Sequence, residues 1–291
     1  MAIFNLGSVN IDHFYMLPHF PEPGETLSAT GHKLGLGGKG TNQSVAAAKA
    51  GAEVFHIGAI GKKDPWVRER IESYGVNCKF LREVDGETGH AVIYVDQQGE
   101  NMIVLDPAAN VKQDSEFVIE AIDQAKPTDT LLMQNETNLQ PQTATFALVK
   151  GMRVIYSAAP FSISAVKDLI PDVSILVMNS IEAAQLCSAM GVSLEQIPVP
   201  QVMVTLGSKG AMWRSNETGE TIEVSSPKVT PVDTTAAGDT YIGYFAAGLD
   251  LGMPVKAAME WAVQAAALKV TRAGTADAIP SANEVKSFRA A

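Results

Sequence analysis

The chain has 291 residues, of which 46% are hydrophobic and 19% charged, and it carries a formal net charge of −10. This composition is typical of a globular protein with a sizeable core. The acidic balance and the lack of Lys/Arg runs argue against a nucleic-acid-binding or basic membrane-binding surface, and a bound polyanion would need local N–H groups, single lysines or a metal.

Targeting and redox signals are weak. Cys78 and Cys187 are too few for a disulfide framework, so both are expected to be buried thiols in a reducing compartment. The N-terminus lacks the pattern of a signal peptide, and no apolar run reaches the roughly 18 residues of a membrane span. We therefore expect a cytoplasmic protein.

Short β-branched runs alternate with helical patterns along most of the chain. Strand-like segments lie at 2–7, 52–61, 130–136, 153–160, 173–180 and 202–210. Helical segments lie at 41–51, 64–75, 141–151 and from 239 onward. This alternation predicts an α/β fold with a mostly parallel sheet, right-handed crossovers, and ligands at the carboxyl ends of the strands.

Two regions depart from the alternation because strand-like segments follow one another without a helix. The segments lie at about 11–17, 27–36 and 88–105, with a hairpin turn at 97–100. They predict a small antiparallel β-sheet lid over the strand ends of one domain that spans 1–291. The segment 187–201, with two prolines, offers a short helix at most where a crossover helix is expected.

The sequence GLGGKG, at 35–40, fits the dinucleotide pattern G-x-G-x-x-G, but it follows the lid-like segment instead of a core strand. It is not a Walker loop either, because Lys39 is followed by Gly40 instead of Ser or Thr. We interpret it as a turn that brings backbone N–H groups, Lys39 and Asn42 close to a polar ligand. A tight turn that only leads into a helix stays open, and so does dinucleotide binding.

Polar residues also lie at strand ends. Asn10 and Asp12 are two residues apart in an extended segment, so their side chains point to one face and can bind vicinal hydroxyl groups. Glu136 is another carboxylate at a strand end. Simple turns with Asx hydrogen bonds are the alternative for Asn10 and Asp12.

Two later motifs suit a nucleotide and its metal. Asn179 and Glu182 lie three residues apart at the start of a helix, where they could hold hydrated Mg²⁺ or form a capping box. The sequence TLGSKG, at 205–210, is a strand followed by a Gly-rich turn. It suits a nucleotide phosphate near Lys209, or else a plain hairpin turn.

The most specific motif is DTTAAGD, at 233–239. The first N–H groups of a helix have no intrahelical partner, and the helix dipole is positive there. Small residues at Ala236, Ala237 and Gly238 let an anion approach these groups. Asp239 is of no use as a phosphate ligand, so we interpret it as a base that takes a proton beside the anion. The alternative is a core helix with an Asp in its first turn.

Together these motifs resemble those of the ribokinase-type (PfkB) sugar kinases. The matching segments come in the family's order from Asn5 to about Pro280: GSVNID, PGET, GGKGTNQSVAAAKAGA, the Asn179–Glu182 pair, TLGSKG and DTTAAGDT. The resemblance implies a three-layer Rossmann-like fold whose lid pairs subunits into a homodimer. It also implies transfer of the γ-phosphoryl group of ATP to a primary hydroxyl group, with D-ribose converted to ribose 5-phosphate.

The resemblance assigns roles to matching positions. Asp239 would be the catalytic base, and the anion hole would be Ala236, Ala237 and Gly238. Sugar binding would fall to Asn10, Asp12, Gly38, Lys39, Asn42 and Glu136. ATP would lie along Asn179, Thr205, Gly207 and Gly210, with Mg²⁺ beside Glu182. A monovalent cation, K⁺, would be held by Asp233 and the carbonyl groups of Thr235 and Gly274.

Several positions depart from the family pattern. Ala278 stands where a Ser near the cation is common, which puts K⁺ activation in question. Val263 replaces the usual His or Asn near the adenine, Ser180 replaces an acid, and Lys63 stands where Asp is common. None of these changes removes the base or the sugar ligands, so we expect an active enzyme.

Other functions stay open at this stage. Within the family, the substrate could be a nucleoside, a hexose such as fructose, a fructose phosphate or a keto-sugar acid. Outside catalysis, the chain could be a sugar-binding protein without turnover. The GLGGKG motif leaves a dinucleotide-dependent oxidoreductase as the third class.

Overall fold

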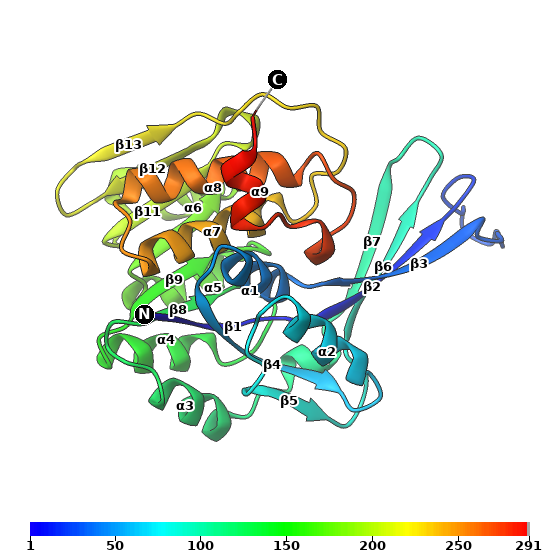
Figure 1. The fold of residues 1–291 in the computed structure, drawn as a ribbon, viewed down its shortest axis with the longest axis horizontal. Coiled ribbons are helices and arrows are strands. Elements are labelled where there is room, and N and C mark those ends of the chain that lie inside the picture. The colour runs from blue at the N-terminus through cyan, green and yellow to red at the C-terminus, as the bar shows by residue number, and fades with distance from the viewer. Residues whose placement is uncertain (290–291) are drawn as a thin grey trace.

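The computed structural model describes residues 1–289. A nine-stranded sheet forms the body, and a four-stranded sheet projects from it as the lid (Figure 1). The body sheet has the order β13-β12-β11-β10-β9-β8-β1-β4-β5. Its strands are β1 Ala2–Leu6, β4 Glu53–Gly61, β5 Leu81–Val84, β8 Thr130–Met133, β9 Arg153–Ser157, β10 Ile175–Asn179, β11 Gln201–Thr205, β12 Ala211–Ser215 and β13 Thr221–Val224.

The strands from β5 to β11 in this order pair in parallel, and β12 and β13 add an antiparallel edge. Helices cover both faces, because successive residues of a buried strand point to opposite sides. Ile3 belongs to one hydrophobic cluster, and its neighbour Phe4 belongs to the other. The predicted three-layer α/β fold is confirmed.

Two groups of helices form the outer layers. The first cluster includes residues of α1 Lys39–Lys49, α2 Pro65–Ser73, α7 Ala237–Asp250, α8 Val255–Lys269 and α9 Ala282–Ser287. The second group is α3 Ser115–Asp123, α4 Gln140–Val149, α5 Ile163–Leu169 and α6 Ser180–Met190. Short 3₁₀ turns lie at η1 Ala108–Val111, η2 Ile170–Asp172, η3 Leu194–Gln196, η4 Gly207–Lys209 and η5 Ala276–Ala278.

Helices α1 and α7 lie unusually close together because small residues line their contact. A Cβ atom added at Gly243 of α7 would lie 2.5 Å from the Ala46 Cβ atom and 2.5 Å from the Gln43 carbonyl oxygen of α1. The first turns of both helices meet near the carboxyl ends of the central strands, so this packing positions the polar residues that begin them.

The lid has the order β3-β2-β6-β7, with β2 Asn10–Met16, β3 Gly31–Gly37, β6 Gly89–Val95 and β7 Asn101–Asp106. The predicted lid strands and the hairpin between β6 and β7 are confirmed. The expectation that the lid is antiparallel throughout is wrong, because β2 and β6 pair in parallel. Both strands leave the body in the same direction, since each follows a strand at the same edge of the parallel sheet.

Some elements had no predicted counterpart: β5, β12, β13, α3, α5, α8 and α9. Of these, α5 and α9 are too short for a clear periodic pattern. The crossover before β11 is shortened as expected, since 187–201 holds only the end of α6 and one 3₁₀ turn. The extent of a single domain over 1–291 stays a prediction. Across residues 1–289, no helix combines the length and apolarity needed to cross a bilayer.

Candidate active site

The turn at 35–40 brings the lid, the first strand and α1 together. A Cβ atom at Gly37 would lie 2.0 Å from an Asp12 carboxylate oxygen, so this carboxylate lies directly against the Gly37 backbone. A Cβ atom at Gly40 would lie 2.3 Å from both the Gly7 Cα atom and the Ser8 nitrogen. Only glycine fits at Gly40, because its neighbours there are backbone atoms, and a side chain at Gly37 would displace the Asp12 carboxylate. Close packing thus explains these glycines without a dinucleotide.

Asn10 and Asp12 lie on β2, and both are buried. The Asn10 Oδ1 atom accepts a hydrogen bond of 2.7 Å from the Asn110 side chain, whose own Oδ1 atom accepts one from the Val9 N–H group. Burial, followed by the nearby charge of Glu136, raises the pKa of Asp12 to about 7. This carboxyl group is therefore poorly solvated in the absence of a ligand.

Glu136 closes the same cluster from the end of β8. Its Oε2 atom accepts hydrogen bonds from the Ser8 hydroxyl group and, at 3.0 Å, from the Lys39 N–H group. The Ser8 hydroxyl oxygen in turn accepts from the Gly40 N–H group at 3.1 Å. Glu136 is thus tied to the first turn of α1, beside Asn10 and Asp12.

Asp239 lies in the first turn of α7, opposite α1. Its Oδ2 atom accepts a hydrogen bond of 3.1 Å from Asn42 Nδ2, and its Oδ1 atom accepts one of 2.9 Å from Gln43 Nε2. The Asn42 Oδ1 atom is buried and has no hydrogen-bond partner within the described residues, so it is available to a hydroxyl group. Gln43 is held in turn by Gln134, and Gln134 by Asn5.

Several backbone N–H groups where α7 begins have no hydrogen-bond partner within residues 1–289. Ala236 has a φ of 58° and a ψ of 11°, a left-handed conformation that non-glycine residues rarely adopt. The Ala237 N–H group donates to the Thr234 carbonyl oxygen at 3.2 Å. Within residues 1–289, the N–H groups of Ala236, Gly238 and Asp239 have no partner. The predicted anion hole therefore retains unpaired donors at Ala236 and Gly238, while the Ala237 donor is engaged.

Lys39 lies between three carboxylates. Burial alone lowers the pKa of Lys39, but Asp239, Glu136 and Glu182 outweigh it and raise that pKa. Lys39, Asp239 and Glu182 line one cavity of about 170 Å³. Lys39 therefore places a positive charge at this cavity, near the carboxylates of Asp239 and Glu182.

Asn179 and Glu182 form a capping box, which is one of the two arrangements predicted for this pair. The Asn179 Oδ1 atom accepts from the Ile181 and Glu182 N–H groups at 2.9 Å each, and the Asn179 N–H group donates to Glu182 Oε2 at 2.8 Å. Both residues also line the 170 Å³ cavity. A Mg²⁺ ion that keeps several waters needs one or two carboxylates plus phosphate oxygens, so Glu182 fits this role. No group of three or more His, Cys, Asp or Glu residues within 1–289 is placed to hold a metal.

A second cavity, of about 540 Å³, adjoins the first. Thr205, Thr234, Ala237 and Gly238 line both cavities. The larger one is also lined by Gly207, Ser208, Gly210, Ser226, Pro227, Lys228, Val229, Pro231, Tyr241, Val263, Ala266, Ala267 and Val270. This mostly apolar lining suits a flat aromatic ring, and the turn at 207–210 is both the hairpin between β11 and β12 and a wall of the cavity.

The predicted cation ligand Asp233 lies just before α7. Its Oδ1 atom accepts from the Thr235 N–H group, and its Oδ2 atom accepts from the Gly274 N–H group, each at 2.9 Å. Its carbonyl oxygen accepts a hydrogen bond of 3.0 Å from the ammonium group of Lys269, the last residue of α8. The structure thus brings Asp233, Thr235 and Gly274 together, with a lysine beside them.

Several contributing residues were missed by the sequence analysis. Ser8 and Gln43 lie within the GSVNID and GGKGTNQ motifs, so the motifs did signal them. Asn110 and Gln134 carry no local signal, because their contacts come from segments more than 90 residues away. Lys269 could have been noticed as the only charge in the apolar run WAVQAAALKV.

The chain is similar in sequence to known proteins. Residues 2–282 match the family model described as pfkB family carbohydrate kinase. The chain is 34% identical to a ribokinase of Haemophilus influenzae, covering 97% of this chain and 96% of that protein. It is 31% identical to a deoxyribokinase of Salmonella typhi, covering 99% and 98% respectively.

The fold is also similar to solved structures. The structure of Arabidopsis thaliana ribokinase complexed with ribose and ATP superposes with a TM-score of 0.85 and 27% sequence identity. The superposition covers 99% of this chain and 98% of that chain.

Proposed function

Because the chain belongs to the pfkB family of carbohydrate kinases, we propose that it transfers the γ-phosphoryl group of ATP to the 5-hydroxyl group of D-ribose. The observation that carries this proposal is the position of Asp239. Its carboxylate is oriented by two side-chain amides and lies beside unpaired N–H groups at the start of α7. A base next to an anion site is what phosphoryl transfer to an alcohol requires.

The sugar binds between the lid and the first turn of α1. Asn10 and Asp12 take the vicinal hydroxyl groups, and Glu136 and Lys39 take further oxygens on the other side. The unpaired Asn42 Oδ1 atom accepts from a sugar hydroxyl group. Asn10 and Glu136 accept hydrogen bonds from Asn110 and Ser8, and Asp12 packs against Gly37. Because these three side chains are held before the ligand arrives, they lose little entropy on binding.

The reaction proceeds as an in-line displacement. The sugar hydroxyl oxygen attacks the γ-phosphorus while Asp239 accepts its proton, and the bond from the γ-phosphorus to the bridging oxygen breaks to release ADP. The amides of Asn42 and Gln43 keep the carboxylate oriented for this proton transfer. The free N–H groups at Ala236 and Gly238 stabilise the charge on the transferred group.

The nucleotide lies in the 540 Å³ cavity, with its phosphates directed toward Gly238 and the 170 Å³ cavity. Val263 and its apolar neighbours cover the adenine, and Thr205, Gly207 and Gly210 follow the ribose and phosphates. Asn179 lies on the phosphate side. Glu182 would hold Mg²⁺ on this side, and the ion would supply positive charge that neutralises part of the phosphate charge.

Two further expectations belong to this proposal. The lid would pair two subunits into a homodimer, as the family resemblance implies. An enzyme of this kind that consumes ATP and carries two lone cysteines would work in the cytoplasm.

The test is ATP turnover with ribose, deoxyribose, fructose, adenosine and 2-keto-3-deoxygluconate. We expect selective turnover of ribose, with phosphorus NMR placing the phosphate on the 5-oxygen. Asp239→Asn should lower kcat by about 10²–10⁴-fold, the usual contribution of a general base, while ribose still binds. Asp168→Asn, on the exposed face of α5, is the matched control.

Other results would redirect the proposal. Faster turnover of deoxyribose or adenosine would keep the mechanism and change the substrate. If Asp239→Asn retained most of its activity, the base would be assigned wrongly. Sugar binding without turnover of any substrate would indicate a binding protein instead of a kinase.

A further inference from the structure

The site predicted to hold a monovalent cation contains a positive charge that belongs to the chain itself. The side chain of Lys269 is completely buried. Its ammonium group donates to the Asp233 carbonyl oxygen at 3.0 Å and lies 4.0 Å from the Asp233 Oδ1 atom. A buried ammonium group needs such partners, because an unpaired charge in the interior is very costly.

The oxygens around this point do not favour an added metal ion. Both carboxylate oxygens of Asp233 already accept backbone N–H groups, from Thr235 and from Gly274. The side chain that faces Gly274 is the methyl group of Ala278, which offers no oxygen. An ion that shared Asp233 with Lys269 would also meet a like charge in a region of low dielectric constant.

Two carboxylates and a helix end surround the ammonium group. Burial lowers the pKa of Lys269, and the carboxylates of Asp233 and Asp239 offset this lowering only in part. Lys269 is also the last residue of α8, where the negative end of the helix dipole stabilises a cation. Its position thus supplies three sources of negative potential.

We propose that the Lys269 ammonium group takes the place of K⁺, so that this kinase works without an added monovalent cation. The inference rests on the proposed function. Lys269 is a positioning residue: by holding the Asp233 carbonyl group, it sets the path of 233–235 into Ala236, whose N–H group belongs to the anion hole. In this way the ammonium group positions the anion hole through the backbone, without contacting the bound anion.

The test compares phosphoryl transfer in KCl with that in tetramethylammonium chloride at equal ionic strength. We expect the wild-type protein to be equally active in both salts. Lys269→Ala should lose at least about tenfold in kcat without K⁺, and KCl or NH₄Cl should restore much of it, because the truncation opens a space for the ion. Lys269→Met keeps the volume without the charge, so it should be impaired in every salt.

A second readout does not depend on activity. An ion that binds only the folded protein raises its melting temperature. KCl, compared with tetramethylammonium chloride, should raise the Tm of Lys269→Ala and leave that of the wild type unchanged. Lys256→Ala, on the exposed side of the same helix, is the control and should behave as the wild type.

Two results would overturn the inference. One is a wild-type enzyme that needs K⁺ for turnover or gains Tm from it; the other is a fully active Lys269→Met in tetramethylammonium chloride. If Lys269→Ala does not fold, the activity of Lys269→Met in tetramethylammonium chloride still tests the inference. If the wild type phosphorylates no sugar, the proposed function fails, and the Tm comparison still tests the ion site.

Discussion

Asp12 is buried at the proposed sugar site. Its carboxyl group lies against the Gly37 backbone and faces the charge of Glu136 across the proposed sugar site. Burial and this neighbouring charge raise its pKa to about 7. A sugar hydroxyl group that donates a hydrogen bond to Asp12 would stabilise its ionised carboxylate, which burial otherwise disfavours. The stability of the ligand-free protein and sugar binding therefore depend on the same atoms.

This pKa shift predicts a pH dependence of stability. Between about pH 4 and pH 7 the folded state keeps a proton on Asp12 that the unfolded state has lost, so the free energy of unfolding falls as pH rises. The limiting slope is about 1.4 kcal/mol per pH unit. Asp12→Asn should remove this contribution and gain stability relative to the wild type at pH 7. Urea unfolding at pH 5, 6 and 7 measures the difference.

Asp250 provides the control for this prediction. Burial raises the pKa of Asp250 to about 6. Asp250→Asn should therefore reduce the pH dependence of the free energy of unfolding only below about pH 6. The decrease in this free energy between pH 6 and pH 7 should remain. An Asp12→Asn variant whose pH profile parallels that of the wild type would show that Asp12 is ionised throughout.

At the level of elements, the contact between α1 and the chain after β1 sets the position of the proposed base, Asp239. Gly40 lies against Gly7 and Ser8, and α7 packs closely on α1 through Gly243. These contacts fix the distance between the amides of Asn42 and Gln43 and the carboxylate of Asp239. The alignment of the site thus depends on backbone approach as well as on the polar side chains.

Gly40→Ala tests this dependence. The new Cβ atom would lie 2.3 Å from backbone atoms of Gly7 and Ser8, so α1 must move outward. We expect a loss of stability of about 1–3 kcal/mol from overpacking and a fall in kcat/KM of about 10²-fold from misplacement by roughly 1 Å. Thermal unfolding and steady-state kinetics measure both.

The matched control is Gly31→Ala at the outer end of β3. There the added Cβ atom would make only an ordinary contact of 3.5 Å with Met16, so activity should be retained. Equal losses in the two variants would mean that the contact of Gly40 has no special importance.

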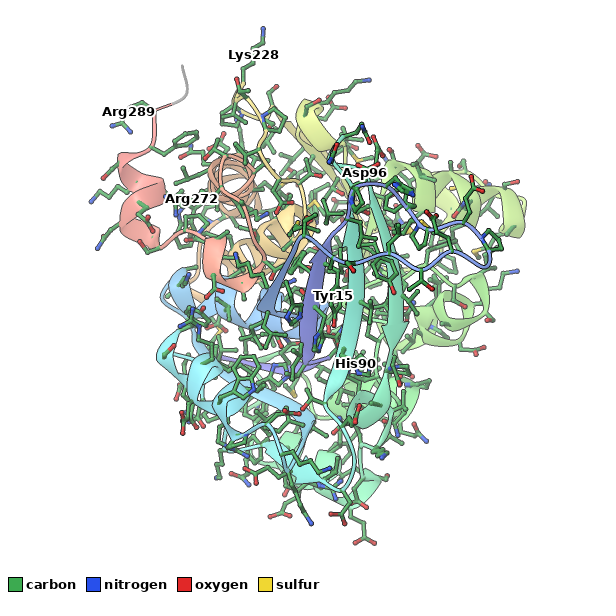
Figure 2. All side chains as sticks on the ribbon, turned by 90° about the vertical axis from the view of Figure 1, so that its right-hand side faces the viewer. Tyr15, His90, Asp96, Lys228, Arg272 and Arg289 are labelled. Atoms are coloured by element: carbon green, nitrogen blue, oxygen red, sulfur yellow. The ribbon has the colours of Figure 1, made fainter. Side chains whose placement is uncertain are left out.

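On the scale of the whole molecule, the lid projects from the body (Figure 1) and leaves an apolar edge strand exposed. Figure 2 views the lid sheet from outside, with Tyr15 of β2 and His90 of β6 on it and Asp96 at its outer turn. On the edge strand β7, Met102, Ile103, Val104 and Leu105 are all more than half exposed. An apolar edge strand of this kind invites pairing with another chain. A second copy of the lid is the partner that the family resemblance implies.

The homodimer prediction follows from this edge. The wild-type protein should have twice the mass of one chain in analytical ultracentrifugation, and Val104→Lys should shift it toward the monomer because the charge would be buried at the interface. Val149→Lys, at an exposed position of α4, should remain dimeric. A monomeric wild type at micromolar concentration would contradict the prediction.

The sequence by itself determined the fold class, the lid and most of the candidate site. These features have local signatures: alternating periodicity for βαβ units, close-packed glycines at 35–40, and small residues before Asp239. The capping box at Asn179 and Glu182 was likewise predictable, because it depends on residues three apart. Motif order then identified the family.

Only the tertiary structure decided which groups meet across the chain. Three features join segments far apart in sequence. They are the parallel pairing of β2 with β6, the hydrogen bond from Asn110 to Asn10, and the hydrogen bonds of Gln134 to Gln43 and Asn5. Lys269 illustrates the reason. Its sequence context shows an isolated charge in an apolar helix, but its partner Asp233 lies 36 residues away and is brought to it by the packing of α8 against the loop before α7.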